Sequence, residues 1–257
     1  MMKPRFACQT ISWGNNQKEH LPRVFAEIAS AGFDGVEVGF RHIADTPPVE
    51  LQRMLKAEGL TLVASHVGGN LEDTGQAGGE RDMLDTVLDY LDELGVRRLM
   101  YSGLNAEDPD ELIVEVGKLR RGVERATERG IDLLYHNHNW EFQNGGRIIE
   151  ALYAEDTIGF CPDVGWIHKA GEDIAATLER MGDRIGAVHF KDFASMGDQV
   201  DAVCLGTGVV PLKEAAGWVE KNLAGDVWVI AEQDSTDGPT ADMARTNIDF
   251  LRTAFQA

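Results

Sequence analysis

Residues 97–137 read RRLMYSGLNAEDPDELIVEVGKLRRGVERATERGIDLLYHN and contain one full repeat of the pattern that decides the fold. An apolar, β-prone run begins near Arg98, and a polar loop and a helical pattern over residues 109–128 follow it. Pro109 suits the first turn of a helix, and Gly130 suits the cap that ends one, just before a second apolar run at Asp132. Strand, helix and strand in this order predict a βαβ unit with parallel strands.

The same pattern extends in both directions along the chain. Apolar runs recur about every 30 residues, and they begin near Phe6, Gly35, Thr61, Arg98, Asp132, Ile158, Ile185 and Val227. Helical periodicity is clear over residues 21–31, 49–58, 81–94, 109–128, 174–181 and 240–255. An open, doubly wound sheet would have a phosphate-binding glycine turn after its first strand, which residues 12–15 (SWGN) lack. Eight units predict an α/β fold, a single-domain (β/α)8 TIM barrel over residues 1–257.

The charge and composition of the chain limit the kinds of molecule that it can bind. The chain has 257 residues with 43% hydrophobic and 26% charged side chains, and its formal net charge is −19. Such a surface repels nucleic acid and anionic membranes, although a local cationic pocket could hold a small anion. The longest apolar runs, such as residues 227–231, have strand length, and residues 1–11 carry no secretory signal pattern. Three dispersed cysteines suit reduced thiols, so we expect a cytoplasmic protein.

Polar side chains gather where the predicted strands end. In a barrel of this kind the carboxyl ends of the strands and the loops after them build the active site. A single histidine at a strand end is often a core residue whose hydrogen bonds are all made within the protein. Here, however, five of the seven histidines fall at strand ends. They are His66, His136, His138, His168 and His189, and the acids found there are Glu37, Glu141, Asp163, Glu232 and Asp234.

Four of these positions suit one divalent metal ion. Glu141, Asp163, His189 and Glu232 follow four consecutive predicted strands, which places them on one side of the barrel mouth. Three carboxylates and one imidazole favour Mn²⁺, followed by Mg²⁺, Co²⁺ or Zn²⁺. Salt bridges or helix caps are the structural alternative for each carboxylate.

The segments around these residues resemble the xylose isomerase-like TIM-barrel superfamily, in its sugar isomerase/epimerase and inosose dehydratase branch. The matching segments are YHNHNWEF (135–142), PDVGWIHKAG (162–171), VHFKD (188–192), AEQD (231–234) and GFDGVEVG (32–39), with Ser65-His66. The resemblance covers nearly the whole chain and implies one catalytic cation held by Glu141, Asp163, His189 and Glu232. Many relatives carry the first ligand at the position of His136, so His136 or His138 is the alternative to Glu141.

A departure from the superfamily pattern bears on nucleic acid. Several relatives, and the similar endonuclease IV, have a histidine three residues after the aspartate of the sixth strand. This chain has Trp166 there. Together with the net charge of −19, this substitution argues against a DNA repair enzyme.

The resemblance implies proton transfer beside the carbonyl of a keto-sugar or cyclitol, with the metal stabilising an enediolate. Glu141 and Glu232 would exchange the proton, and Lys191 and His138 would stabilise oxyanions or protonate a leaving hydroxyl. The alternative to a catalytic role for Lys191 is a structural ion pair with Asp192 or with another acidic residue at the rim of the barrel. Expected substrate-binding residues are His66, His136, Trp13, Trp166, His168 and Asp234, and Trp140 is a further candidate for stacking on a sugar ring. For the histidines and tryptophans, the alternative to substrate binding is a structural role in packing.

Three functions follow. A sugar isomerase/epimerase comes first, an inosose dehydratase-like lyase second, and a non-catalytic sugar-binding barrel third. The short turn Gly206-Thr207-Gly208 contains no basic residue, which favours an unphosphorylated substrate. Residues 68–79 are glycine-rich and long enough for a lid, with an ordinary loop as the alternative. Barrels of this kind are often oligomers, so a homo-oligomer is possible.

Overall fold

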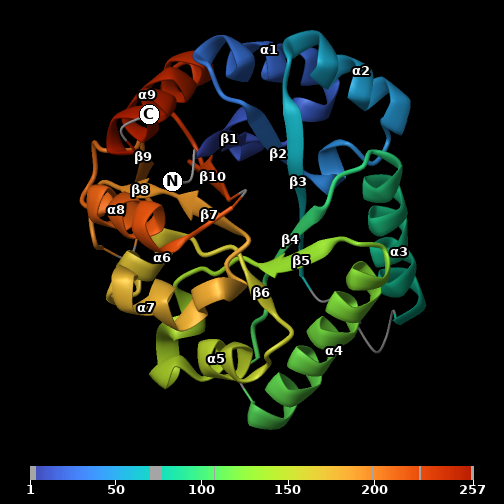
Figure 1. The fold of residues 1–257 in the computed structure, drawn as a ribbon, viewed down its shortest axis with the longest axis vertical. Helices are drawn as coiled ribbons and strands as arrows, with labels where there is room; N and C mark the ends of the chain where they lie inside the picture. Colours follow the sequence, from blue (N-terminus) through green and yellow to red (C-terminus); the bar gives the residue numbers. More distant parts are fainter. Residues whose placement is uncertain (1–3, 70–76, 107, 198, 226, 256–257) are drawn as a thin grey trace.

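The computed structural model describes residues 4–69, 77–106, 108–197, 199–225 and 227–255 (Figure 1). Eight parallel strands lie side by side in the order β6-β5-β4-β3-β2-β1-β10-β7. They are β1 (Arg5–Gln9), β2 (Gly35–Gly39), β3 (Thr61–Gly68), β4 (Arg98–Ser102), β5 (Asp132–Tyr135), β6 (Gly159–Phe160), β7 (Ala187–Phe190) and β10 (Trp228–Ala231). Parallel bridges from Phe160 to Ile185 and from Asp163 to His189 join the two ends of this sheet. The predicted TIM barrel is confirmed.

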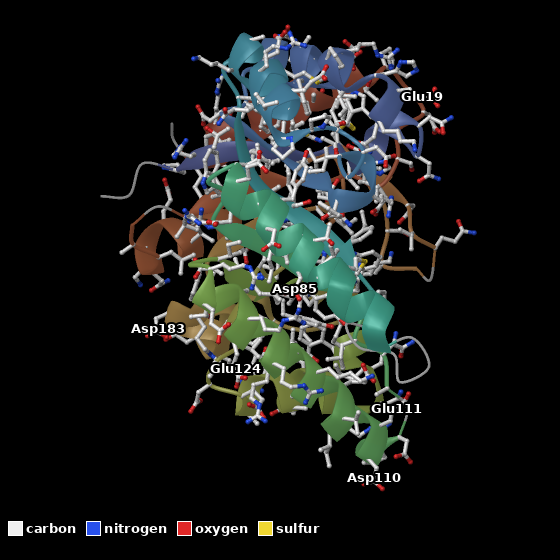
Figure 2. All side chains as sticks on the ribbon, turned by 90° about the vertical axis from the view of Figure 1, so that its right-hand side faces the viewer. Glu19, Asp85, Asp110, Glu111, Glu124 and Asp183 are labelled. Carbon is white, nitrogen blue, oxygen red and sulfur yellow. The ribbon has the colours of Figure 1, made fainter. Side chains whose placement is uncertain are left out.

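Helices surround the strands on the outside (Figure 1). They are α1 (Leu21–Ala31), α2 (Pro48–Glu58), α3 (Ala77–Glu93), α4 (Pro109–Glu128), α5 (Gln143–Ala154), α6 (Val164–Lys169), α7 (Ile174–Met181), α8 (Leu212–Asn222) and α9 (Thr240–Ala254). The predictions for α1, α4 and α7 are confirmed to the residue, and those for α2, α3 and α9 differ only at their ends. Acidic side chains lie on the outer surface, including Asp110, Glu111 and Glu124 of α4 (Figure 2).

Sequence periodicity did not predict α5, α6 and α8. Helix α5 contains a kink in which Asn144, Gly145 and Gly146 all have positive φ, so its hydrophobic spacing is interrupted. Helix α6 has only six residues, which is too few for a periodic signal. We have no such local reason for α8, which follows Pro211 as a regular amphipathic helix.

The barrel interior is filled at its amino-terminal end and polar at its carboxyl end. Trp228 at the start of β10 is buried there, and the Arg5 guanidinium lies 4.0 Å from the centre of its ring. Small residues lie on the inner side of other strands, among them Ala7, Ala64 and Ala187. The small side chains leave room above them for longer polar groups, which form the candidate site. Residues 70–76 of the lid predicted over 68–79 lie outside the described residues.

Candidate functional site

Four buried polar side chains converge at the carboxyl end of the barrel. His136 directly follows β5, Asp163 lies just beyond β6, His189 lies on β7 and Glu232 directly follows β10. Each offers one ligand atom, and these atoms all lie within 4.8 Å of one another. His136, Asp163 and His189 are 0% exposed and Glu232 is 4% exposed. We call these four residues the metal-ligand group.

Two members of the group carry buried atoms that have no hydrogen-bond partner in the described part of the chain. These atoms are both ring nitrogens of His136 and Oδ2 of Asp163. Burial without a partner costs about 1–3 kcal/mol per polar group, so each such atom calls for a ligand. Burial and the neighbouring charge of His189 hold the pKa of His136 well below its usual value, which keeps the ring neutral. A neutral imidazole has the lone pair that a metal ion requires.

His189 is fixed between two carboxylates. Its Nδ1 lies 2.5 Å from Glu232 Oε2, and its Nε2 lies 2.8 Å from Oε2 of Glu37, a buried residue of β2. Burial opposes a charge on His189, but Glu37 and further polar neighbours raise its pKa well above its usual value. When Nε2–H donates to Glu37, Nδ1 faces the metal-ligand group. Glu37 therefore has the place of the outer carboxylate that commonly orients a metal-binding histidine.

Glu141 lies outside the metal-ligand group. It belongs to a short 3-10 turn, Trp140–Phe142, and its Oε1 accepts a hydrogen bond of 2.7 Å from the Tyr135 hydroxyl. Its Oε2 accepts one of 2.8 Å from the backbone N–H of His138. Burial raises the pKa of Glu141 to about 7. Both oxygens thus hold the loop after β5, and His136 is the residue of that segment that joins Asp163, His189 and Glu232.

Asp163 combines a local and a candidate ligand role. Its Oδ1 accepts a hydrogen bond of 3.0 Å from the backbone N–H of Trp166 and caps α6. Its Oδ2 points to the metal-ligand group and lies 3.7 Å from Lys191 Nζ. Burial raises the pKa of Asp163 to about 7. The helix cap proposed as a structural alternative is present, and it uses only one of the two oxygens.

Lys191 neutralises the acids of the site. Its ammonium lies 3.1 Å from Glu232 Oε1 and 3.1 Å from Asp234 Oδ1, and its side chain is 1% exposed. Burial disfavours the charged ammonium, but the nearby carboxylates outweigh burial and raise the pKa of Lys191. The ion pair expected as its structural alternative is therefore formed with rim acids. The Lys191 ammonium still lies beside Glu232, where it could stabilise a negatively charged oxygen.

A cavity of about 220 Å³, which we call the mouth cavity, has Glu232 of the metal-ligand group in its lining. Its lining includes four predicted site residues, His66, His138, Glu232 and Asp234, together with Gln9, Thr10, Gln17, Arg41, His42 and Ser102. Oγ1 of Thr10 and Oε1 of Gln17 are buried and have no hydrogen-bond partner among the residues that the structure describes. These atoms can bind the hydroxyl groups of a ligand. The size of the cavity suits a small molecule.

The sequence and fold of this chain are similar to those of known proteins. A family model described as xylose isomerase-like TIM barrel matches residues 25–254. The chain belongs to this family. An inosose dehydratase of Mesomycoplasma hyopneumoniae is 25% identical over 285 aligned positions, which cover 95% of this chain and 93% of that protein.

Solved structures show the same fold. A sugar phosphate isomerase/epimerase from Parabacteroides distasonis superposes with a TM-score of 0.79 at 21% identity, over 99% of this chain and 95% of that one. The IolI protein with a bound zinc atom gives a TM-score of 0.79 at 15% identity, over 98% of each chain. Family membership agrees with an enzyme of the isomerase, epimerase or dehydratase type. None of the described helices is long and apolar enough to cross a membrane.

The tryptophans predicted to bind substrate contact other side chains of the protein. Trp13 donates from Nε1 to Glu27 Oε2 of α1 at 2.8 Å, and Trp166 packs on Phe193 with ring centres 4.7 Å apart. Trp140 stacks on the His138 ring at 4.0 Å. Within the described chain, none of the three tryptophans is part of the cavity lining. Stacking on Trp140 supports the His138 ring, whose Nδ1 has no hydrogen-bond partner in the described structure.

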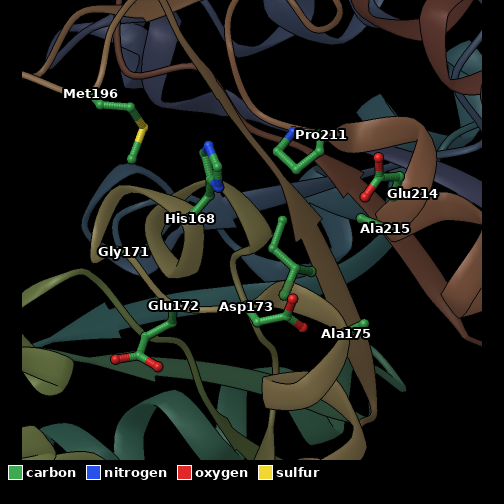
Figure 3. Close-up of a pocket in the computed structure, with 10 residues that line it drawn as sticks. His168, Gly171, Glu172, Asp173, Ala175, Met196, Pro211, Glu214 and Ala215 are labelled. Carbon is green, nitrogen blue, oxygen red and sulfur yellow. The ribbon is translucent and has the colours of Figure 1, made fainter.

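His168 lies away from the other predicted site residues. It belongs to α6 and lines a separate cavity of about 380 Å³ (Figure 3). Glu172, Met196 and Glu214 are among the other residues of that cavity. Successive residues of a helix point in different directions around its axis. His168 follows Asp163, the N-cap residue of α6, by five positions, so its side chain points in another direction.

The glycine turn after β7 is occupied by a side chain of the protein. The Asp192 carboxylate accepts hydrogen bonds from the backbone N–H groups of Gly206, Gly208 and Val210 at 2.9, 3.0 and 3.1 Å. A Cβ on Gly208 would lie 2.3 Å from Asp192 Oδ1, so the close approach requires glycine. This turn therefore serves to hold the loop in place.

We expect Asp192→Ala to destabilise the protein by about 3 kcal/mol, because four backbone donors, the three above and the N–H of Phe193, lose a charged acceptor. Urea unfolding measures the effect. Asp249→Ala, at an exposed position of α9, is the matched control and should change stability by less than about 0.5 kcal/mol. Equal effects of the two substitutions would contradict this role for Asp192.

Several residues that line the mouth cavity were not predicted from the sequence. The ends of β1 and β4, or the segments after them, contain Gln9, Gln17 and Ser102. The rule that a barrel has its active site at the carboxyl ends of its strands would have predicted these residues. Arg41 and His42 follow β2 in a 3-10 turn, and Arg41 Nε donates to His42 Nε2 at 3.0 Å. Their signal was weak because a single arginine on a loop is common. Glu37 was marked as a strand-end acid, but its contact with His189 spans 152 positions of the sequence.

Proposed function

We propose that this chain is a divalent-metal-dependent enzyme that removes a proton next to the carbonyl of a keto-sugar or cyclitol. The observation that carries the proposal is the metal-ligand group, with buried His136 and Asp163 atoms that have no hydrogen-bond partner in the described structure. His136, Asp163, His189 and Glu232 would hold the ion. Two imidazoles and two carboxylates suit Zn²⁺, Co²⁺ or Mn²⁺ better than Mg²⁺, which prefers oxygen ligands alone.

The ion would polarise the substrate carbonyl and so lower the energy of the enediolate. Glu232 lines the cavity as a carboxylate, and besides holding the ion it would accept the proton. Although burial opposes its charge, Lys191 and His189 hold the pKa of Glu232 well below its usual value. Lys191 can stabilise the oxyanion or donate a proton to a leaving hydroxyl. His66, whose Nε2 lies 2.8 Å from Ser102 Oγ, is placed to bind a substrate hydroxyl.

The arrangement favours water elimination as the second step. Epimerisation requires a second group that returns the proton to the other face. Glu141, expected in that role, bonds within its own loop and, unlike Glu232, is not among the described residues that line the cavity. Elimination requires a base and a group that assists the leaving hydroxyl, and the charged Lys191 ammonium beside Glu232 would give that assistance. The relatives named inosose dehydratase agree with this outcome. Isomerisation or epimerisation is the alternative outcome of the same proton removal.

Protein loaded with Mn²⁺, Co²⁺ or Zn²⁺ and incubated with an inosose and with ketohexoses in heavy water tests the proposal. We expect one keto substrate to lose water. NMR and the absorbance of the unsaturated ketone detect this loss. Deuterium in a recovered isomer without loss of water would assign an isomerase or epimerase. Sugar binding without exchange, unchanged in Glu232→Gln, would identify a binding barrel and reject the proposal.

A further inference from the structure

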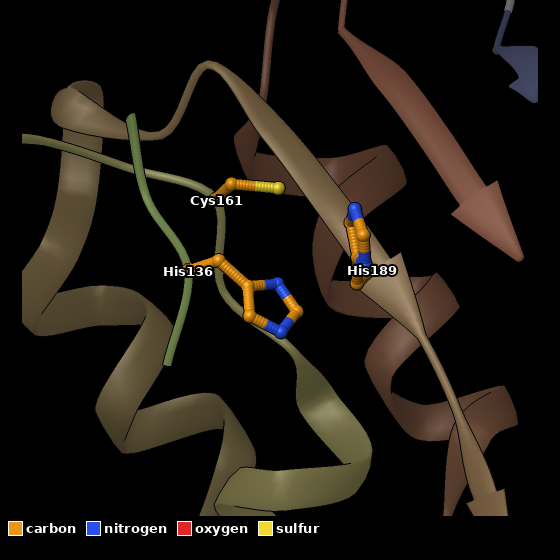
Figure 4. A group of neighbouring side chains, drawn as sticks. All are labelled: His136, Cys161 and His189. Carbon is orange, nitrogen blue, oxygen red and sulfur yellow. The ribbon is translucent and has the colours of Figure 1, made fainter. Parts of the chain in front are cut away.

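A thiol lies next to the metal-ligand group on the inner side of the barrel. Cys161 precedes Asp163 by two residues in an extended segment, so both side chains point into the barrel, one layer apart. His136, Cys161 and His189 each offer a ligand atom, and these atoms lie within 4.8 Å of one another. Figure 4 shows the Cys161 thiol and the His136 ring directed from neighbouring segments toward His189. All three side chains are fully buried.

Two ligand sets therefore share the same pair of imidazoles. The first adds the oxygens of Asp163 and Glu232, and the second adds the sulfur of Cys161. Oxygen ligands suit hard cations, whereas thiolate sulfur selects soft ones. The two ring nitrogens of His136 have no hydrogen-bond partner in the described chain, so the ring is available to either set.

We propose that His136, Cys161 and His189 form a second, deeper site for thiophilic cations such as Cd²⁺. The inference rests on the metal site of the proposed function. On binding, Cys161 Sγ forms a bond to the cation, and the thiol proton is released to solvent. Thiolate sulfur is a soft ligand, so a hard ion such as Mn²⁺ is expected to prefer the set that contains the oxygens of Asp163 and Glu232.

The deeper site implies a form of inhibition. A cation bound by Cys161 lies on the inner side of the metal-ligand group, farther from the mouth cavity. The shared imidazoles cannot serve both sets at once, so a thiophilic cation excludes the ion held with Asp163 and Glu232. Thiophilic cations should therefore compete with Mn²⁺ for one place per chain.

The other cysteines provide controls. Cys204 is partly exposed and lies in the loop before α8, outside both candidate ligand sets. Cys8 of β1 is buried and donates to its neighbour Gln9 at 3.6 Å. Neither belongs to a metal-binding group in the described part of the chain.

The full chain, freed of metal by a chelator, is titrated with Cd²⁺ while the ultraviolet sulfur-to-cadmium charge-transfer band is recorded. We expect the band to saturate at one Cd²⁺ per chain in the wild type, Cys8→Ser and Cys204→Ser. It should be absent in Cys161→Ser and Cys161→Ala, with Cd²⁺ affinity lowered by about tenfold or more. Mn²⁺ binding, followed by electron paramagnetic resonance, should persist in both Cys161 variants, which also shows that they fold.

Other outcomes separate this inference from the proposed function. Cd²⁺ bound without a sulfur band, or with a band that survives in Cys161→Ala, would overturn the deeper site and leave the metal-ligand group intact. A band lost only in Cys8→Ser would overturn it as well. Failure of the wild type to bind either Cd²⁺ or Mn²⁺ would overturn both proposals.

Discussion

His136→Ala is expected to lower the affinity of the protein for its divalent cation by about 100-fold or more. The ring is a fully buried member of the metal-ligand group, and alanine offers no atom in its place. Loss of a residue that only orients a ligand already costs 10- to 100-fold in affinity, so loss of a ligand should cost at least as much. Elemental analysis of the purified protein and a Mn²⁺ titration measure the effect.

Glu141→Gln is the matched control for His136→Ala. The glutamine can accept from the His138 N–H with its oxygen, and its amide can donate to the Tyr135 hydroxyl, so the loop keeps both hydrogen bonds. We expect this variant to retain about one metal ion per chain. Metal loss in Glu141→Gln, with retention in His136→Ala, would restore Glu141 as the ligand from this segment.

Lys191→Met is expected to destabilise the metal-free protein by about 3–5 kcal/mol at pH 8. The substitution removes the cation that lies within 4 Å of Glu232, Asp234 and Asp163. Among the described residues, Glu232 then keeps only histidine partners, and buried Asp163 loses its ion pair with lysine. The deficit should shrink as the pH falls, because the carboxylates then take up protons instead of remaining charged. Urea unfolding at pH 8 and pH 5, in the presence of a chelator, measures both effects.

Turnover provides a second measurement of Lys191→Met. If the ammonium stabilises an oxyanion or protonates a leaving group, turnover should fall by about 10²- to 10⁴-fold even in metal-loaded protein. Lys213→Met, at an exposed position of α8, is the control and should leave both stability and turnover nearly unchanged. Full turnover in metal-loaded Lys191→Met would restrict Lys191 to a structural role.

Much of the barrel could be predicted from the sequence because its signals are local. Helices α1, α4 and α7 carry an uninterrupted hydrophobic spacing and clear ends, so their bounds matched the prediction. The kink at residues 144–146 and the six residues of α6 interrupted or shortened that signal. The site region was predictable for a similar reason, since the barrel places the carboxyl ends of all its strands at one rim.

The sequence by itself determined the parallel eight-stranded barrel and the rim at which His136, Asp163, His189 and Glu232 gather. Strand periodicity and topology suffice for that result. Only the tertiary structure decided that Glu141 turns back to Tyr135, that His168 faces another cavity, and that Glu37 contacts His189. The physical reason is that side-chain direction after a strand depends on loop geometry and on partners far away in sequence. The hydrophobic periodicity of the sequence contains no information on loop geometry or on distant partners.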